Sequence, residues 1–371
     1  ADLSALAFIV KVLNGDLPAG SSAKAGTFRS RFQQLTGPLM AKSVEDTLFF
    51  RHHGLIALNE VGAEPLPRVF SLNRFHDEMT ERLKRQADAL SGTSTHDTKR
   101  GEDARARLYA LSEEPQVWAD AVERWRRINA SSVKKLDDGP APDPAVEWML
   151  YQALAGVWPT DLQIEKKAAL EAIEERFLQF TEKALREAKL RTSWNDVKED
   201  YEDAVKTYAR RLLSPDNRDF LGDFSTTIRP FIRAGHVNSL TQTLIKLTAP
   251  GVPDIYQGSE GYDLSLVDPD NRREPDFEKL EKQLDEDAPL ASTDEDDWNS
   301  GRLKQHLIAK VLKLRQESPA LFRKGDYIPL QATGKRQRNI VAFARQHENK
   351  ALVVIAPRLV LEALHDAGSP Q

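Results

Sequence analysis

The sequence predicts an α/β protein with more than one domain, and three observations lead to this prediction. A weakly extended segment at 87–93 runs into a charged stretch at 94–100, which a helical segment follows. Residues 101–213 are rich in Ala, Glu, Lys and Arg and have the periodicity of helices. From Tyr327 onward, apolar and polar residues alternate as they do in strands. Strand-to-helix junctions that concentrate charge are where α/β barrels place their chemistry, so the stretch 94–100 is the first candidate site.

The composition is that of an ordinary soluble globular protein rather than a disordered one. The 371 residues are 40% hydrophobic and 29% charged, and they are enough for two or more domain cores. A net charge of −5 argues against general nucleic-acid binding, and the lack of cysteine excludes disulfides, thiolate zinc sites and a cysteine nucleophile. No apolar run reaches the ~20 residues of a membrane span, and no signal-peptide core follows Ala1. We therefore expect no membrane partner and a cytoplasmic location.

Apolar residues at three- and four-residue spacing predict helices, and short apolar runs bounded by Gly and Pro predict strands. The predicted helices lie at 6–13, 28–36, 73–88, 162–191, 228–247 and 299–316. Gly37-Pro38 is expected to break the second helix, so that Leu39-Met40-Ala41 begins a strand. Another strand is expected at 252–257, and the acidic run 285–297 is expected to form an exposed loop.

Asp97 lies within the charged stretch and has two interpretations. An isolated Asp ahead of a helix is most often the N-cap, whose carboxylate accepts a backbone N–H. The other interpretation is a functional carboxylate, because His96, Lys99 and Arg100 crowd the same few residues. From these residues alone, the cap is favoured.

Two further polar segments follow predicted strands, one at 42–46 and one at 268–273. Their candidate binding residues are Lys42, Glu45, Asp46, Asn271, Arg272 and Arg273. Charge at the C-terminal ends of strands suits the working face of a barrel, although the first segment on its own is better explained as a surface turn. The sequence contains no metal-ligand spacing, phosphate-binding loop or dinucleotide glycine motif, so we predict no metal and no cofactor.

Five separated segments, in this order along the chain, resemble the maltooligosyltrehalose synthases, which are glucan mutases of the α-amylase-like glycoside hydrolase family 13. The segments are Met40–Thr47, Leu58–Gly62, Thr93–Asp103, Ala249–Glu260 and Val267–Arg273. The resemblance extends from about residue 28 to residue 360. A His-Asp pair alone would be a weak signal, whereas these segments in this order are a specific one.

The resemblance implies a (β/α)8 TIM barrel, of which the chain would hold the C-terminal part. The implied divisions are a partial barrel with strands six and seven at 1–100, a large helical insertion at 101–229, strand eight and closing helices at 230–325, and the start of a truncated C-terminal β domain at 326–371. Strand six would then be the segment 39–42. The strands after Tyr327 end before such a domain closes, so we expect a chain cut from a longer one. Its open barrel edges would be covered by dimerisation or rearrangement.

The resemblance also implies roles for the candidate residues. Asp97 would be the third of three barrel carboxylates, which stabilises and positions but is neither nucleophile nor acid, and His96 would hydrogen-bond the sugar beside it. The other substrate-binding candidates would clamp a released glucose, and they are Lys99, Arg100, Lys42, Glu45, Asp46, Asn271, Arg272 and Arg273. No segment matches the motifs of the nucleophile and the acid/base, which would lie before Ala1, so the chain alone is predicted to be inactive.

The implied reaction is that of a (1→4)-α-D-glucan 1-α-D-glucosylmutase, an isomerase of trehalose biosynthesis. It would convert the reducing-end α-1,4 bond of a maltooligosaccharide into an α,α-1,1 bond, and a trehalose-releasing hydrolase would be its functional partner. One alternative is a non-catalytic carbohydrate-binding scaffold. The other is an amylase-type glycosidase or a trehalohydrolase, and the long helical block and the Lys-Arg pair after Asp97 count against it.

Overall fold

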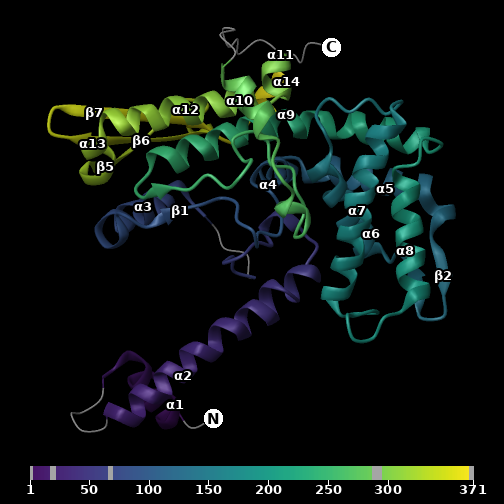
Figure 1. The fold of residues 1–371 in the computed structure, drawn as a ribbon, viewed down its shortest axis with the longest axis horizontal. Helices are drawn as coiled ribbons and strands as arrows, with labels where there is room; N and C mark the ends of the chain where they lie inside the picture. The colour runs from purple at the N-terminus through teal and green to yellow at the C-terminus, as the bar shows by residue number, and fades with distance from the viewer. Residues whose placement is uncertain (1–2, 17–21, 66–69, 286–294, 367–371) are drawn as a thin grey trace.

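The computed structural model describes residues 3–16, 22–65, 70–285 and 295–366 (Figure 1). Over these residues the chain is a helix-rich α/β structure with small sheets. Its helices are α1 (Leu3–Asn14), α2 (Ser22–Met40), α3 (Leu72–Gln86), α4 (Glu102–Tyr109), α5 (Pro115–Asn129), α6 (Pro144–Val157), α7 (Lys167–Ala188), α8 (Glu199–Leu212), α9 (Arg218–Thr248), α10 (Phe277–Asp285), α11 (Glu295–Asn299), α12 (Arg302–Glu317), α13 (Pro319–Lys324) and α14 (Leu361–Asp366). Its strands are β1 (Leu90–Ser91), β2 (Lys134–Leu136), β3 (Gly139–Ala141), β4 (Val252–Pro253), β5 (Asp326–Leu330), β6 (Ile340–His347) and β7 (Lys350–Pro357).

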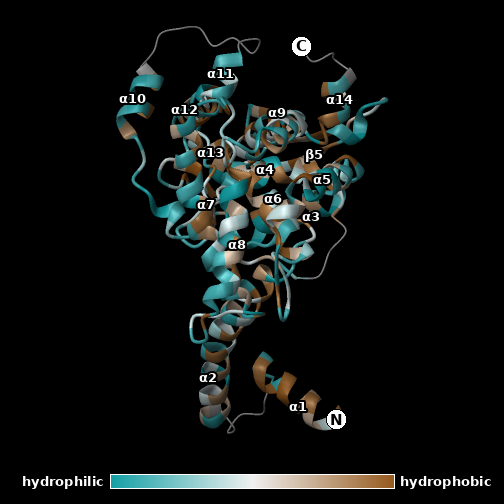
Figure 2. Ribbon diagram, turned by 90° about the vertical axis from the view of Figure 1, so that its right-hand side faces the viewer, coloured by the Kyte–Doolittle hydropathy of each residue, from teal (hydrophilic) through white to brown (hydrophobic). Residues whose placement is uncertain are grey.

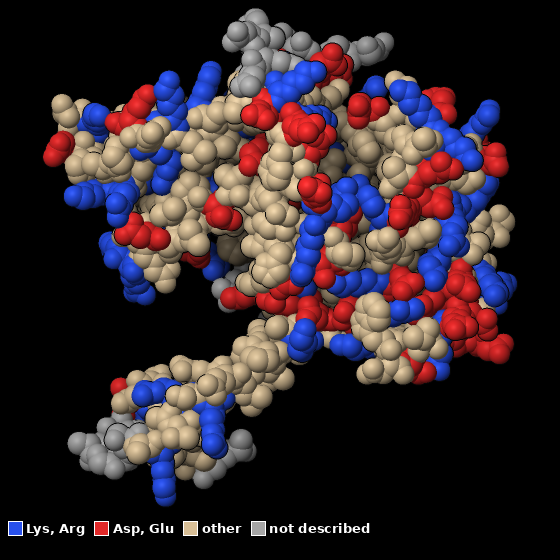
Figure 3. Space-filling view, viewed as in Figure 1, with Lys and Arg blue, Asp and Glu red and all other residues tan. Residues whose placement is uncertain are grey.

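Helices α5 to α8 and the first part of α9 form a helical unit around one apolar core, at the right of Figure 1. Trp125 lies at its centre, with its ring centroid 5.2 Å from that of Trp118 and 4.9 Å from that of Phe224. Aromatic rings at such distances add to the stability that burial provides. Acidic and basic side chains intermingle over the outside of this unit (Figure 3), as expected of solvated helix faces.

Helix α9 runs from the helical unit to the β strands at the other end of the molecule (Figure 1). Helix α4 packs closely across it at Gly235, where a Cβ atom would lie 2.7 Å from the Cα atom of Arg107. Because real side chains do not approach a backbone so closely, glycine is needed at this crossing. The last turn of α4, a helix that directly follows the candidate site, is therefore seated against α9.

Strands β5, β6 and β7 form an antiparallel sheet in that order, which confirms the strands predicted after Tyr327. The guanidinium of Arg345 on β6 is buried and donates hydrogen bonds to the carbonyl oxygens of Thr248 and Phe322. These contacts tie the sheet to the end of α9 and to α13.

Strands β1 and β4 form a short parallel pair, in which Leu90 lies opposite Val252 and Ser91 opposite Pro253. The strand predicted at 252–257 therefore exists but is two residues long. Gly251 precedes it with a φ of +126°, and a Cβ atom there would lie 2.5 Å from Ser91 Oγ. The close approach and the positive φ both require glycine, so the pairing of these strands depends on it.

The strand predicted at 39–41 is wrong. Helix α2 continues through Pro38 to Met40, and a π-helical turn follows at Ala41–Glu45. The turn is closed by the N–H of Asp46, which donates to the carbonyl of Ala41 at 2.8 Å. Leu, Met, Ala and Lys are good helix formers. No strand in the described part of the chain pairs with this segment, so its preference for helix determines its structure.

The predicted helices are present in the structure, but several of them begin or end at other residues than predicted. α9 begins at Arg218, earlier than predicted, and α7 begins only at Lys167. In the acidic run expected to be a loop, residues 286–294 lie outside the described residues, whereas Glu295–Asn299 is helix α11.

Helices α1 and α2 extend away from the rest of the molecule, at the bottom of Figure 1, and α1 is mostly apolar in Figure 2. Phe8 on α1 is 59% exposed and Leu39 on α2 is 58% exposed. The described part of the chain thus leaves apolar side chains on both helices uncovered. None of the helices in the described ranges is long and apolar enough to cross a membrane.

Candidate functional site

The candidate site is the loop from 92 to 101, which connects β1 to α4. Asp97 and His96 lie at its tip with exposed side chains. The loop is folded by its own threonines, because Thr98 Oγ1 donates to the carbonyl of Thr95 at 2.9 Å and Asp97 N–H donates to Thr95 Oγ1 at 3.2 Å. Asp97 is not the N-cap of α4, since Gly101 holds that position. The carboxylate is therefore not used for capping and faces the outside.

Asn271 holds the inner side of this loop. Its buried side-chain amide donates to the carbonyl oxygens of Thr95, His96 and Thr98 at 3.1–3.2 Å. One amide that binds three carbonyls fixes the path of the backbone on both sides of Asp97. Asn271 was predicted to bind substrate. In the structure, its side-chain N–H groups instead hold the backbone of the loop.

Glu60 holds the other end of the loop and was not singled out from the sequence. Its carboxylate accepts hydrogen bonds from Lys99 N–H at 2.7 Å, Arg100 N–H at 3.3 Å and Arg105 Nη1 at 2.6 Å. Charge-assisted hydrogen bonds of this kind are the stronger ones in proteins. The only sequence signal for Glu60 is its place within Leu58–Gly62, one of the segments that resemble the synthases.

Asp46 connects the π-helical turn to the loop. Lys99 Nζ lies 2.9 Å from Asp46 Oδ1, and Lys42 donates to Oδ2 of the same carboxylate. Partial burial raises the pKa of Asp46, but the hydrogen bonds from Lys42 and Lys99 outweigh it and hold the pKa below its usual value. The pKa of Lys42 is raised mainly by Asp46, with a smaller contribution from the charge of Asp97. The ammonium of Lys42 therefore lies in the field of the candidate carboxylate.

The predicted clamp residues divide into exposed and buried groups. Lys42 is 77% exposed, and Arg272 and Arg273 are exposed as well, so all three are accessible to a ligand. Lys99 is only 4% exposed and is occupied by Asp46. Arg100 is buried, donates to the carbonyl of Ile56 at 2.9 Å, and has a pKa lowered by burial to about 10.

The remaining contacts of these arginines and of Glu45 are local. Arg272 Nε donates to the carbonyl of His96 at 3.3 Å, and Arg273 forms an ion pair with Asp270. Glu45 accepts the N–H of Gly62 at 2.8 Å and so ties the π-helical turn to the segment that carries Glu60. The structure thus brings Asp97, His96, Lys42, Glu45 and Asp46 into one region, with Arg272 beside His96.

A buried ionic cluster lies behind the loop. Lys304 on α12 is fully buried, and its Nζ lies 2.7 Å from Glu102 Oε1 and 2.7 Å from Asp103 Oδ2 at the start of α4. Lys246 on α9 lies 3.3 Å from Glu102 Oε2 and donates to Thr93 Oγ1 at 2.7 Å. Four charged groups from three helices thus meet directly beneath the site. Glu102 and Asp103 lie within the segment Thr93–Asp103 but were not singled out as site residues. Lys246 and Lys304 were not predicted because they lie far from the loop in the sequence.

The cluster shifts its own pKa values in opposite directions. Burial raises the pKa of Glu102, but the charges of Lys304 and Lys246 outweigh it and lower the pKa to about 2. Burial dominates at Asp103 and raises its pKa. Glu102 is therefore the carboxylate that the cluster keeps ionised most firmly.

Asp263 joins the loop to the chain segment after β4. Its side chain accepts a hydrogen bond from Ser94 Oγ at 3.0 Å, and its N–H donates to Asp103 Oδ2 at 2.7 Å. A Cβ atom at Gly101 would lie 2.3 Å from the carbonyl oxygen of Asp263, so this approach requires glycine. The described residues contain no cluster of three His, Cys, Asp or Glu side chains that could hold a metal ion.

The geometry presents one carboxylate and one imidazole at the tip of a loop that other elements immobilise. Asn271 and Glu60 fix the backbone on its two sides, and the ionic cluster fixes the helix that follows it. An immobilised carboxylate can stabilise a positive charge or accept hydrogen bonds from hydroxyl groups without further reorganisation. The arrangement therefore suits a reaction at a hydroxyl-rich substrate.

Comparisons with known proteins lead to the same group of enzymes as the sequence segments. No protein-family model matches the chain. A curated protein of Mycobacterium tuberculosis, named putative maltooligosyl trehalose synthase, is 35% identical over 339 residues, which are 89% of this chain and 39% of that protein. The chain thus spans well under half the length of this relative.

Solved structures give the same result. Maltooligosyltrehalose synthase from Arthrobacter ramosus matches with a TM-score of 0.73 and 32% identity over 91% of this chain and 40% of its own. A hypothetical maltooligosyl trehalose synthase of Sulfolobus tokodaii matches with a TM-score of 0.73 and 30% identity over 91% of this chain and 42% of its own. Over nearly all of its length, therefore, the chain is a homologue of a part of the maltooligosyltrehalose synthases.

Proposed function

We propose that the chain supplies one part of the catalytic unit of a maltooligosyltrehalose synthase. The reaction would turn the reducing-end α-1,4 bond of a maltooligosaccharide into an α,α-1,1 bond by intramolecular transglycosylation. The observation that carries this proposal is the exposed Asp97 carboxylate, which follows a parallel strand and is immobilised by Asn271 and Glu60. Similarity to the synthases over 89% of the chain supports the choice of reaction.

Asp97 would act as a fixed carboxylate that stabilises positive charge. Cleavage of a glycosidic bond passes through an oxocarbenium-like transition state, and retention at the anomeric carbon requires a nucleophile and an acid/base carboxyl roughly 5 Å apart. We assign both of these groups to the portion of a synthase that this chain does not cover. Asp97 would lower the energy of the cationic ring, and His96 would donate a hydrogen bond to a sugar hydroxyl.

The exposed cations and carboxylates near the loop would hold the glucose that is released. A mutase must retain this glucose and turn it over while it keeps water out. Lys42, Arg272 and Arg273 are exposed and can reach a ligand, whereas Glu45 and Asp46 anchor the turn that carries Lys42. Lys99 and Arg100 would act indirectly, through Asp46 and through the backbone at Ile56.

The proposed architecture is a partial (β/α)8 barrel in which β1 and β4 are strands seven and eight. Their parallel pairing supports this assignment. Residues 101–229 would be the insertion between these strands, and 326–371 would begin the β domain. Residues 1–100 and 230–325 would then belong to the barrel. A trehalose-releasing hydrolase would consume the product.

A hybrid protein tests the proposed function. The portion of the Arthrobacter ramosus synthase that this chain does not cover is joined to the chain, and the hybrid is incubated with maltopentaose. We expect reducing ends to disappear without release of glucose, and a product with an α,α-1,1 bond detectable by proton NMR. The chain without the added portion should give no product.

Other outcomes would replace the proposal. An increase in reducing ends, with glucose and shorter maltooligosaccharides as products, would identify an amylase-type hydrolase. Binding of maltopentaose by a folded hybrid without any turnover would identify a carbohydrate-binding scaffold.

The control is a hybrid that carries Gln337→Ala. Gln337 is an exposed residue of the β domain, so this variant shows the nonspecific effects of a substitution.

A further inference from the structure

Arg105 on α4 is a buried arginine whose contacts converge on the two ends of the Asp97 loop. Its side chain is 7% exposed, and its planar guanidinium carries donors that point in several fixed directions. Nη2 donates to the carbonyl of Thr93, and Nη1 donates to the carbonyl of Arg100 at 3.2 Å. Thr93 is the second residue of the loop and Arg100 is the last but one, so a single side chain joins its two ends.

The guanidinium of Arg105 is paired with a carboxylate and keeps its charge. Its Nη1 lies 2.6 Å from Glu60 Oε2. Burial lowers the pKa of Arg105, but the charge of Glu60, followed by contributions that include Tyr109 and Glu102, outweighs burial and raises the pKa. Arg105 is therefore charged at neutral pH, where all of its contacts with the loop are present.

The ionic cluster fixes Thr93 from the other side. The hydroxyl of Thr93 donates to Glu102 Oε2 and accepts from Lys246 Nζ at 2.7 Å. Because the cluster binds the side chain of Thr93 and Arg105 binds its carbonyl, the start of the loop is tied to both α4 and α9. The guanidinium of Arg105 extends this restraint to the far end of the loop.

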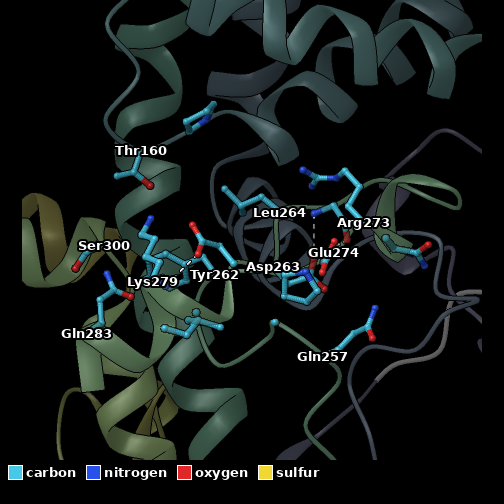
Figure 4. Close-up of a pocket in the computed structure, with 18 of the residues that line it drawn as sticks. Thr160, Gln257, Tyr262, Asp263, Leu264, Arg273, Glu274, Lys279, Gln283 and Ser300 are labelled. Carbon is cyan, nitrogen blue, oxygen red and sulfur yellow. Dashed lines mark hydrogen bonds between the residues drawn. The ribbon is translucent and has the colours of Figure 1, made fainter. Parts of the chain in front are cut away.

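Arg105 lies behind the loop and not in the large cavity beside it. That cavity has a volume of about 710 Å³ and is lined by residues that include Tyr262, Asp263 and Arg273 (Figure 4), whereas Arg105 is not among the described residues that line it. Arg105 borders a smaller cavity of about 280 Å³, below the ~300–1,000 Å³ that is usual for ligand sites. Arg105 can therefore influence a reaction at the tip of the loop through the backbone, without touching the substrate.

We propose that Arg105 is a positioning residue, which sets the place and direction of the Asp97 carboxylate by joining the two ends of its loop. This inference rests on the proposed function, which assigns Asp97 to the reacting bond. Lysine would carry the same charge, but its donors all lie at one atom and cannot reach two carbonyls and a carboxylate as the guanidinium fork does. The contacts of this position thus require arginine.

Arg105→Lys in the hybrid enzyme tests the proposal, with maltopentaose as the substrate. The variant keeps a positive charge beside Glu60 and loses the link between the carbonyls of Thr93 and Arg100. We expect kcat to fall about 10²-fold, as for a catalytic group misplaced by about 1 Å, and KM to stay within about twofold. A fall of kcat at constant KM indicates the loss of an interaction that is made only in the transition state.

Arg107→Lys is the matched control. Arg107 is a buried arginine on the same helix, and it donates to the carbonyls of Ala155 at 2.9 Å and Gly156 at 3.3 Å, at the end of α6 and away from the loop. This substitution should lower the melting temperature comparably and leave kcat unchanged. An equal fall of kcat in both variants would overturn the proposal, because general destabilisation would then explain the loss.

A double variant tests whether Arg105 acts through Asp97. If it does, Arg105→Lys has no further effect once Asp97→Asn has removed the carboxylate, so the double variant should have the kcat of Asp97→Asn alone. A further loss of about tenfold or more in the double variant would overturn the proposal, since contributions that add in this way are independent.

Hydrogen exchange of the full chain separates this proposal from the proposed function. The N–H of Thr98 donates to the carbonyl of Thr95 at 3.4 Å, and the N–H of Lys99 donates to Glu60 at 2.7 Å. Arg105→Lys should speed the exchange of these two amides about tenfold or more, whereas Arg107→Lys should not. If the unsubstituted hybrid is inactive, the proposed function fails and exchange alone decides on Arg105. Unchanged exchange in Arg105→Lys would overturn the positioning role even in an active hybrid.

Discussion

The helical unit and the region around Asp97 are held together in opposite ways. The helical unit buries aromatic and aliphatic side chains, with Trp125, Phe220 and Phe224 fully enclosed. The region around Asp97 buries charges instead, since Glu102 and Lys304 are completely inaccessible to solvent. Both regions include residues of α4 and of α9.

The difference indicates what each region is built to do. Apolar contacts are non-directional, so a core of rings and methyl groups tolerates small shifts. Ion pairs and charge-assisted hydrogen bonds fix both distance and direction, but buried ones add little net stability because the charges lose their hydration. The structure thus uses ionic contacts where a loop must be held in one place, and apolar contacts where a scaffold must only be stable.

The largest effect on stability is expected for Lys304→Met. The substitution leaves Glu102 and Asp103 buried without their shared cation, and loss of one partner of a buried pair costs about 3–5 kcal/mol. Urea unfolding measures the loss. Lys313→Met is the matched control, because Lys313 is exposed on the same helix. Equal stability of the two variants would show that the ionic cluster does not hold the loop.

Acid is expected to weaken the region around Asp97 before it weakens the helical unit. The pKa of Glu102 is lowered to about 2 from an ordinary value of 4.5. Glu102 therefore contributes stability above about pH 4.5, which is lost as the pH falls from there towards 2. Asp103, whose pKa is raised by burial, offsets part of this loss within the cluster. In α6, burial raises the pKa of Glu147, so that protonation of Glu147 favours the folded state and no comparable loss is expected there.

Hydrogen exchange at pH 6 and pH 3, corrected for intrinsic rates, tests this order of events. Amide protection in α4 should fall at the lower pH, while protection in α6 persists. Simultaneous loss of amide protection in both helices would mean that the two regions unfold together. Acid would then not weaken one region before the other.

A smaller effect is expected within the helical unit. Ile173 on α7 is 2% exposed, and Ile173→Val should destabilise the chain by about 1 kcal/mol through the loss of one buried methylene group. Ile128→Val at a position that is 37% exposed should change the free energy of unfolding by less. If Ile173→Val lowered the free energy of unfolding as much as Lys304→Met does, the apolar core would tolerate substitution no better than the ionic cluster.

The periodicity of the sequence predicted most of the helices and the strands after Tyr327. It did not predict the residues that hold the Asp97 loop in place. The helices at α3, α7, α9 and α12 and the strands from Tyr327 followed from local patterns of apolar residues. The strand at 39–41 failed because strands need neighbours, which a local pattern cannot supply, and good helix formers then form a helix.

The exposed pair His96-Asp97 was found because its charge is concentrated in a few consecutive residues. Glu60, Lys246 and Lys304 were missed because their contacts with the loop come from distant parts of the sequence. Asn271 was predicted to touch the substrate, whereas its amide binds the loop backbone. Positioning contacts of this kind become visible only when the chain is folded.

The smallest effect on stability and the largest on activity are expected for Asp97→Asn. Its exposed side chain has no hydrogen-bond partner in the described structure, so the free energy of unfolding should change by no more than about 0.5 kcal/mol. The measurement is the rate at which the hybrid enzyme removes reducing ends from maltopentaose. The account predicts a loss of ~10³-fold with an unchanged melting temperature, as expected when a group that stabilises transition-state charge is removed. A variant that retains a rate within tenfold of the unsubstituted hybrid would contradict the assignment of Asp97 as the carboxylate of this site.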